Sequence, residues 1–94
     1  MTWRNEPQRD VESFPEELKT AFAHSSNNWE ELLRSNRCGC FHCCATFSST
    51  AIRAWTDGAN TALCPVCGFD TVVGDASGFE PAVLFLSRMR LCWF

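Results

Sequence analysis

Four cysteines in two matched pairs are the residues of this chain whose spacing most clearly predicts chemistry. Cys40 and Cys43 form one C-x2-C pair, Cys64 and Cys67 form another, and twenty residues separate the two pairs. A two-residue gap lets a tight turn direct both sulfurs at one ion, and four thiolates complete a tetrahedron around Zn²⁺ at about 2.3 Å. The sequence therefore predicts one structural Zn²⁺ ion with these four cysteines as its ligands.

The remaining cysteines fit such a site less well. Cys38 would form a C-x-C pair with the first ligand, which would strain a turn around a single ion. Cys44 directly follows Cys43, and neighbouring side chains of extended backbone point to opposite faces. We expect Cys38, Cys44 and Cys92 to be buried, inert thiols. His42 lies inside the first two-residue gap, and we expect its ring to point outward into solvent.

A shell closed by four cysteines predicts a structural rather than a catalytic ion. Catalytic zinc keeps one position open and usually has histidine or carboxylate ligands. The second cysteine pair could also act as a redox dithiol, but such pairs begin a helix, whereas an extended segment is predicted here. Asp57, Asp70 and Asp75 could form an acid–base cluster, although turn and capping roles explain each of them separately. We therefore predict that the chain is not an enzyme.

Length and charge predict one small domain that depends on its metal. A chain of 94 residues buries little more than roughly 60% of its unfolded surface, whereas structural zinc contributes about 10–16 kcal/mol in isolated zinc-finger peptides. The formal net charge is −3, and four thiolates with one Zn²⁺ make the loaded protein more negative still. An acidic chain is poorly suited to sequence-independent binding of phosphates.

The cysteine content also bears on the compartment. No apolar run reaches the roughly 20 residues that span a bilayer, and the first residues lack the basic and apolar regions of a secretory signal. Seven cysteines in a chain without an export signal are expected to stay reduced. We therefore predict a cytoplasmic protein with no membrane segment rather than a secreted, disulfide-rich scaffold.

The pattern of apolar residues predicts helices before the metal module. Residues 1–12 are polar and are predicted to form a flexible arm. Residues 13–36 are predicted to hold two helices, with Ser13 as the cap of the first and the polar segment 25–28 between them. The residues expected to face the core are Leu18, Ala21 and Phe22 in the first helix and Trp29, Leu32 and Leu33 in the second.

Residues 37–74 are predicted to form the metal module. Each cysteine pair should occupy a turn that joins short strands, with a strand over 61–63 and a return strand over 69–73. Gly68 can take a positive φ where the second turn leaves the metal. Between the pairs, a short helix is expected to end at Asp57-Gly58. Its cap is expected at Ser48 or Ser49, and its inward face at Ala51, Ile52 and Trp55.

Residues 79–94 are predicted to form a C-terminal helix that begins near Pro81. Its apolar residues form one broad stripe, and Leu84 and Leu91 extend the stripe toward a second face. A helix this apolar must be mostly covered, either by the chain itself or, as its surplus apolar surface indicates, by a homodimer or a protein partner. The predicted partner-binding residues are Phe85, Met89, Trp93 and Phe94.

Several short motifs follow one another along the module and its C-terminal flank. They are Arg37-Cys-Gly-Cys-Phe-His-Cys, Trp55-Thr-Asp-Gly, Thr61-Ala-Leu-Cys-Pro-Val-Cys-Gly-Phe-Asp, Val73-Gly-Asp-Ala-Ser-Gly and Trp93-Phe94. Together they resemble a group of small bacterial proteins labelled only as cytoplasmic or hypothetical. The resemblance covers about the last three fifths of the chain. It implies a bacterial, cytosolic zinc-ribbon protein, and it implies no activity.

These observations together predict an α+β fold, with a small zinc-ribbon, treble-clef-like module, two N-terminal helices and one C-terminal helix in a single zinc-stabilised domain over 13–94. The predicted function is non-catalytic binding of another protein, as an adaptor, an inhibitor or an immunity-type protein. The alternative is a nucleic-acid-binding zinc-ribbon regulator. Arg34, Arg37 and Arg53 around the module favour it, and so does Phe41, which could stack on a base from the tip of the first turn.

Overall fold

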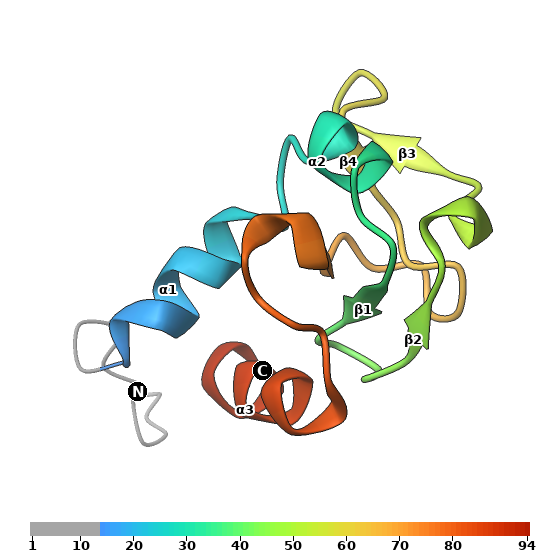
Figure 1. Cartoon of the computed structure of the whole chain (residues 1–94). Coiled ribbons are helices and arrows are strands. Elements are labelled where there is room, and N and C mark those ends of the chain that lie inside the picture. The colour runs from blue at the N-terminus through green and yellow to red at the C-terminus, as the bar shows by residue number, and fades with distance from the viewer. Residues whose placement is uncertain (1–13) are drawn as a thin grey trace, which may run out of the picture.

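The computed structural model describes residues 14–94, so the predicted arm over 1–12 and the predicted cap at Ser13 lie outside the described residues. Two helices, then antiparallel strands and then a last helix follow one another along the described chain, which confirms the α+β class (Figure 1). The helices are α1 (Glu16–Ala23), α2 (Trp29–Leu33) and α3 (Val83–Trp93). The strands are β1 (Cys38–Cys40), β2 (Thr46–Phe47), β3 (Trp55–Thr56), β4 (Thr61–Ala62) and β5 (Val72–Gly74).

A three-stranded antiparallel sheet in the order β2–β1–β5 forms the centre of the fold. Alternate residues of β1 face opposite sides of the sheet. Cys38 and Cys40 therefore join one apolar core, while Gly39 faces α3. A Cβ atom at Gly39 would lie 2.8 Å from Leu86 Cδ1, closer than the two groups can pack. Only a glycine at this position lets α3 approach the sheet so closely.

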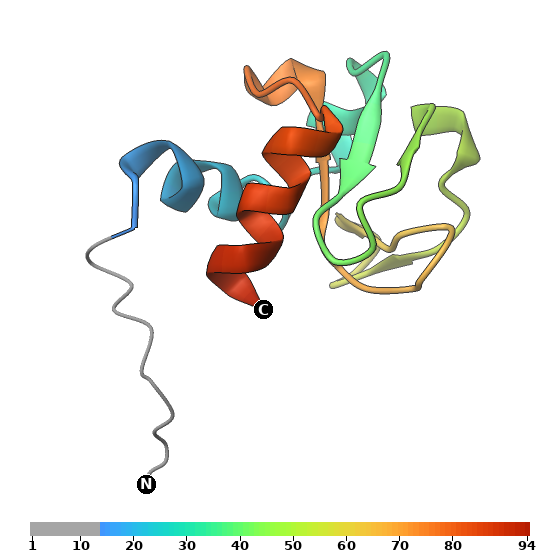
Figure 2. The same cartoon turned by 90° about the horizontal axis from the view of Figure 1, so that it is seen from below.

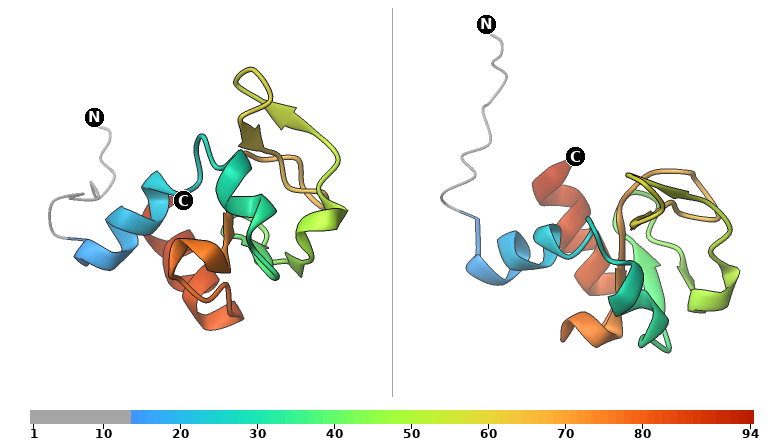
Figure 3. Two further views of the ribbon diagram at one scale, coloured as in Figure 1. Left: turned by 45° about the horizontal axis from the view of Figure 1, so that its top comes forward. Right: turned by 90° about the horizontal axis from the view of Figure 1, so that it is seen from above.

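Two apolar cores lie on the two faces of this sheet. In Figures 2 and 3, α1 and α3 lie side by side on one face, and the β3–β4 hairpin lies beyond the other. The first core contains Leu32, Cys38, Cys40, Ile52, Ala62, Cys64 and Val72. The second core contains Leu18, Ala21, Phe41, Val73, Leu86 and Met89. Strands β1 and β5 are therefore covered on both faces, and all of their residues are buried.

Aromatic contacts hold α1 against α3. Trp93 stacks on Phe22 with ring centroids 4.1 Å apart, and Phe14 meets the same indole edge-on at 5.1 Å. An exposed ion pair of 3.5 Å between Glu17 and Arg88 adds at most about 1 kcal/mol. Phe22 nevertheless remains 41% exposed, because its ring covers Trp93 at the surface of the protein.

The predicted inward face of the second helix is only partly right. Leu32 is buried, but Trp29 is 44% exposed and Leu33 is 62% exposed. The reason is the length of α2, which has five residues and so turns little more than once. A helix this short can direct only one of its apolar residues into the core.

The helix predicted between the two cysteine pairs is wrong beyond its first turn. Ser48 caps a single 3₁₀ turn over Ser49–Ala51, and Trp55 lies in β3, which pairs with β4 in a second sheet. Asp57-Gly58 is the tip of that hairpin, and both residues have positive φ. In a short segment, the spacing of the apolar residues repeats too few times to distinguish a helix from a strand.

The C-terminal helix begins at Val83, two residues later than predicted. Leu86 and Met89 are buried against the sheet, whereas Leu84 and Leu91 are 81% and 75% exposed. The helix therefore has a covered face and an uncovered apolar face. None of the helices within residues 14–94 is long and apolar enough to cross a lipid bilayer.

A buried asparagine joins three elements of the fold. Asn28, which precedes α2, is 2% exposed. Its amide group donates to the carbonyl of Val72 at 2.8 Å and to that of His24 at 3.1 Å. Its side-chain oxygen accepts from the N–H of Ala62 at 3.2 Å. One side chain thus connects the end of α1 with β4 and β5, the strands on either side of the second cysteine pair.

Asn28→Ala should lower the free energy of unfolding by about 2–4 kcal/mol, because the buried carbonyl of Val72 and the buried N–H of Ala62 lose their partner. Unfolding in urea, followed by circular dichroism, measures this change. Asn36→Ala is the matched control, since the Asn36 side chain is exposed, and it should change stability by no more than about 0.5 kcal/mol. Equal urea midpoints for the two variants would contradict this role of Asn28.

Candidate metal centre

The predicted ligand cysteines are close together in the structure. The sulfur atoms of Cys40, Cys43, Cys64 and Cys67 all lie within 4.8 Å of one another. Cys40 and Cys67 are 3.6 Å apart at their sulfurs, and Cys43 and Cys64 are 3.7 Å apart. A tetrahedron of thiolates around one Zn²⁺ has edges of about 3.8 Å, whereas a disulfide bond measures about 2.05 Å. No disulfide joins the cysteines of the described chain, so the four sulfurs fit a single ion.

The two C-x2-C turns, here called knuckles, share one pattern of hydrogen bonds. In each knuckle, the N–H groups two and three residues after the first cysteine donate to its sulfur. The distances are 3.3 and 3.5 Å at Cys40 Sγ, and 3.3 and 3.4 Å at Cys64 Sγ. Donors directed at sulfur favour the thiolate over the thiol, so the backbone of each knuckle is arranged for a metal ligand.

A residue in the left-handed conformation closes each knuckle. The N–H of Cys44 donates to the carbonyl of Cys40 at 2.8 Å, and that of Gly68 donates to the carbonyl of Cys64 at 2.9 Å. Gly68 has φ +84°, which confirms the prediction, and Cys44 has φ +65°. Cys44 thus occupies the position where glycine is favoured. It differs from glycine in having a side chain, whose sulfur lies 4.0 Å from Ser87 Oγ on α3.

The electrostatics of the four thiols differ with their surroundings. Cys43 is exposed as a residue, but local desolvation of its sulfur beside the sulfurs of Cys64 and Cys40 raises the pKa of its thiol. Burial together with the neighbouring sulfur of Cys40 raises the pKa of the Cys67 thiol to about 12. Burial also acts to raise the pKa of Cys64, but the N–H groups of Cys67 and Val66, together with the sulfurs of Cys43 and Cys40, outweigh it and lower that pKa below its ordinary value. Four adjacent thiolates therefore need a cation between them, and the donor set is one that Zn²⁺ accepts.

Thr71 is a neighbour of the site that sequence reasoning missed. Its side chain is buried, and Thr71 Oγ1 lies 3.0 Å from Cys40 Sγ. Groups that hydrogen-bond to metal ligands fix the direction of those ligands. Thr71 comes four residues after Cys67 in the sequence and reaches Cys40 only because this segment aligns with β1, where the N–H of Phe41 donates to the Thr71 carbonyl at 3.0 Å. No sequence motif indicates that alignment.

Contrary to the prediction, the ring of His42 does not project freely into solvent. It stacks on Phe69 with ring centroids 3.8 Å apart, and Phe94 meets it at 4.8 Å. His42 Nδ1 is buried with no hydrogen-bond partner within residues 14–94, and the guanidinium of Arg90 donates to the His42 carbonyl. Because His42 belongs to the first knuckle and Phe69 follows the second, this stack connects the two knuckles without any metal.

The proposed base-stacking role of Phe41 is wrong. Phe41 is fully buried in the core beneath α1 and α3, so no base can reach its ring. Phe47 and Trp55 pack against the other core. The side chain of Phe41 turns inward because Phe41 follows the buried strand β1 and continues its alternation between the two cores.

The contacts of Cys38, Asp57 and Asp75 indicate roles in the fold rather than in chemistry. Burial, followed by the charge of Asp75, raises the pKa of the Cys38 thiol to about 11, which agrees with an inert thiol. Asp57 accepts a hydrogen bond of 3.0 Å from the Thr61 hydroxyl. The carboxylate of Asp75 accepts from the backbone N–H groups of Asn36 and Arg37 at 3.0 and 3.3 Å. Asp57 and Asp75 thus support turns, which accounts for them without acid–base chemistry.

Comparisons with family models, with curated proteins and with solved structures gave no match to this chain. The resemblance to a group of small bacterial proteins therefore stays a prediction. The fold and the site together define a small α+β protein with a four-cysteine centre whose geometry is compatible with one metal ion.

Loss of one ligand should unfold the protein. We predict that Cys64→Ser abolishes tight metal binding, because one of the four sulfurs is lost. The domain should then unfold, because the binding free energy of a structural Zn²⁺ ion, about 10–16 kcal/mol, is as large as the whole stability of a small domain, about 5–15 kcal/mol. Far-UV circular dichroism with and without a chelator, together with metal analysis, measures the effect. The matched control Cys92→Ser should keep one ion per chain. An apo protein that melts at the temperature of the loaded protein would contradict the prediction.

Metal affinity should weaken as the pH falls. Cys43 and Cys67 have raised pKa values, so without an ion they hold protons at neutral pH, and binding displaces those protons. For each proton displaced, lowering the pH by one unit should weaken the apparent affinity by about tenfold. Competition with a chromophoric chelator at several pH values measures the slope, and a pH-independent affinity is the result that would refute this linkage.

Proposed function

We propose that the four-cysteine centre holds one structural Zn²⁺ ion and that the protein is a non-catalytic module of the zinc-ribbon type that binds another protein. The spacing of the four sulfurs supports the zinc part of this proposal. Two of the sulfur–sulfur distances are 3.6 and 3.7 Å, which match the edges of a tetrahedron of thiolates around Zn²⁺. Thiolate ligands in a tetrahedral arrangement select zinc or iron, and metal analysis distinguishes these two.

The non-catalytic part of the proposal follows from the number of ligands. Four cysteine sulfurs occupy every position of a tetrahedral ion, so no position is left for a water molecule or a substrate. The donors around the sulfurs are backbone N–H groups and the hydroxyl of Thr71, which hold the ligands in place. The ion in this arrangement supplies folding energy and rigidity rather than a nucleophile.

The uncovered face of α3 supports the protein-binding part of the proposal. Of the predicted partner-binding residues, Met89 is fully buried within the chain, Phe85 stacks on Phe79 at 5.6 Å, and Trp93 stacks on Phe22. Phe94 is the one exposed residue of these four, with an exposed fraction of 43%. The more accessible apolar residues of the helix are Val83, Leu84 and Leu91.

We therefore place the proposed contact on the face defined by Leu84 and Leu91, here called the α3 face. These two residues are seven positions apart, which is close to two helical turns, so they lie on one side of the helix. Arg88 lies between them on the same side and pairs with Glu17. Apolar residues in such an arrangement favour contact with a second apolar surface, either another copy of this chain or a different protein.

Nucleic-acid binding is the second candidate, and one observation favours it. Among residues 14–94, the side chains of Arg37 and Arg53 have no ion pair or hydrogen bond to an acidic group. The net charge of −3 opposes it, because phosphate binding without sequence preference needs a basic surface. Binding to a labelled oligonucleotide that weakens steeply with salt would favour this second function.

The double variant Leu84→Asp with Leu91→Asp should abolish partner binding and leave the metal content at one ion per chain. The reason is that two buried carboxylates would replace the apolar contact. Light scattering after gel filtration measures self-association, and affinity capture with quantified stoichiometry measures binding to other proteins. Leu33→Asp, another exposed leucine, is the matched control. Unchanged binding by the double variant, or no stoichiometric partner for the unaltered chain, would count against the proposal.

A further inference from the structure

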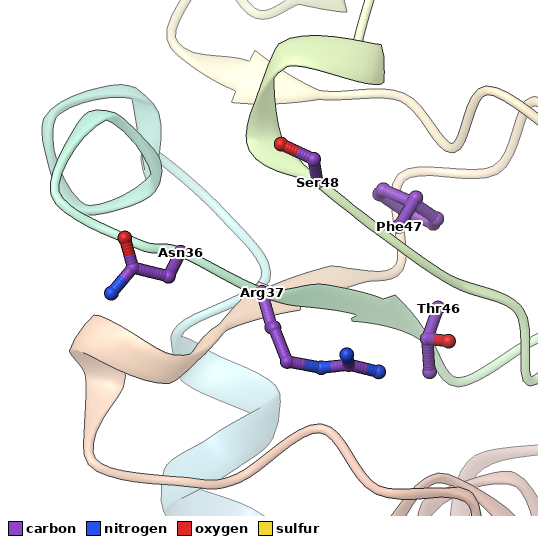
Figure 4. A pocket seen from close by; sticks show the side chains of 5 residues that line it. All are labelled: Asn36, Arg37, Thr46, Phe47 and Ser48. Atoms are coloured by element: carbon purple, nitrogen blue, oxygen red, sulfur yellow. The ribbon is translucent and has the colours of Figure 1, made fainter.

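A hollow of about 210 Å³ lies beside the edge of the central sheet, away from the residues of the metal centre and of the α3 face. Figure 4 shows the five side chains that line it. The hollow is smaller than the roughly 300–1,000 Å³ of pockets for drug-sized ligands, so it suits a single side chain better than a cofactor. The lining residues are Asn36, Arg37, Thr46, Phe47 and Ser48.

Strand β2, which supplies part of this lining, is an edge strand of the sheet and has no pairing partner on its outer side within residues 14–94. The N–H of Cys40 donates to the carbonyl of Ala45 at 2.9 Å, and bonded and unbonded residues alternate along an antiparallel pair. After Ala45, the next residue of this segment that hydrogen-bonds to β1 is therefore Phe47. Thr46, which lies between them opposite Gly39, directs its backbone N–H and carbonyl away from β1, toward the outer side of the edge. An extended peptide can pair with these two groups.

The charge of the hollow is positive. Arg37 is its only charged lining residue, and the Arg37 guanidinium has no partner within residues 14–94. Asp75 lies nearby, but its carboxylate oxygens accept from the backbone N–H groups of Asn36 and Arg37 instead. Figure 4 shows the Arg37 side chain extending along the sheet toward Thr46. In a strand added beside β2, the residue opposite Thr46 would turn its side chain to this same face.

We propose that this hollow, with the open edge of β2, is a docking site for an extended peptide segment of a partner protein, which adds a strand beside Thr46 and places an aspartate or glutamate carboxylate against Arg37. The guanidinium fork matches a carboxylate with two parallel hydrogen bonds, and the side chain of Thr46 lines the same hollow. The site extends the proposed protein-binding function to a second surface and does not use the α3 face.

The test is a selection of random heptapeptides, displayed on phage, against the full metal-loaded chain. The enriched peptides should share an acidic residue flanked by β-branched residues, and fluorescence polarisation should show about 10- to 100-fold weaker binding to Arg37→Glu, as expected for a hydrogen bond to a charged group. The matched control is Arg53→Glu, because Arg53 is likewise exposed and lies outside the hollow. A peptide methylated on its backbone nitrogens should also lose binding, since it cannot pair with β2.

Three results would overturn the proposal. They are the absence of an acidic consensus, equal binding by Arg37→Glu and the unaltered chain, and binding that survives backbone methylation. Binding of a labelled single-stranded oligonucleotide with the same dependence on Arg37 would also reject it, in favour of nucleic acid. Peptide binding should persist in the double variant Leu84→Asp with Leu91→Asp. The experiments can therefore reject the proposed contact at the α3 face and the proposed peptide site independently. Metal content and circular dichroism establish that each variant is folded.

Discussion

The mutual approach of four sulfur atoms is the constraint on which the rest of the structure depends. The sulfurs belong to two knuckles that are twenty residues apart in sequence, yet they lie within 4.8 Å of one another. Two of the cysteines, Cys40 and Cys64, are also members of an apolar core. The chain between the knuckles must therefore return to its starting point, and the β3–β4 hairpin is the segment that makes this return.

Backbone geometry and aromatic packing support this approach from two sides. Within each knuckle, N–H groups and a left-handed residue fix the direction of the first sulfur, and the buried Thr71 hydroxyl adds a further contact to Cys40. Between the knuckles, the ring of His42 lies flat on Phe69, and Phe94 at the end of α3 covers the pair. The C-terminal helix is thus connected to the metal centre as well as to α1.

The clustering of the four cysteines could be predicted from the sequence because it depends on local spacing. The two-residue gap brings both sulfurs of a pair to one side of a tight turn, and Gly68 supplies the positive φ that the second turn needs. The contacts of His42, Phe41 and Thr71 could not be predicted, since each arises from strand pairing or helix packing between distant segments. The hairpin at Asp57-Gly58 was missed for a different reason, because a glycine in the left-handed conformation ends a helix and also turns a hairpin.

The unequal burial of the four sulfurs gives the centre an inside and an outside. Cys40 and Cys64, the first cysteine of each knuckle, are buried, whereas Cys67 is half-buried and Cys43 is exposed. A chelator or an oxidant arriving from solvent would therefore meet the second cysteine of each knuckle before it reached the first.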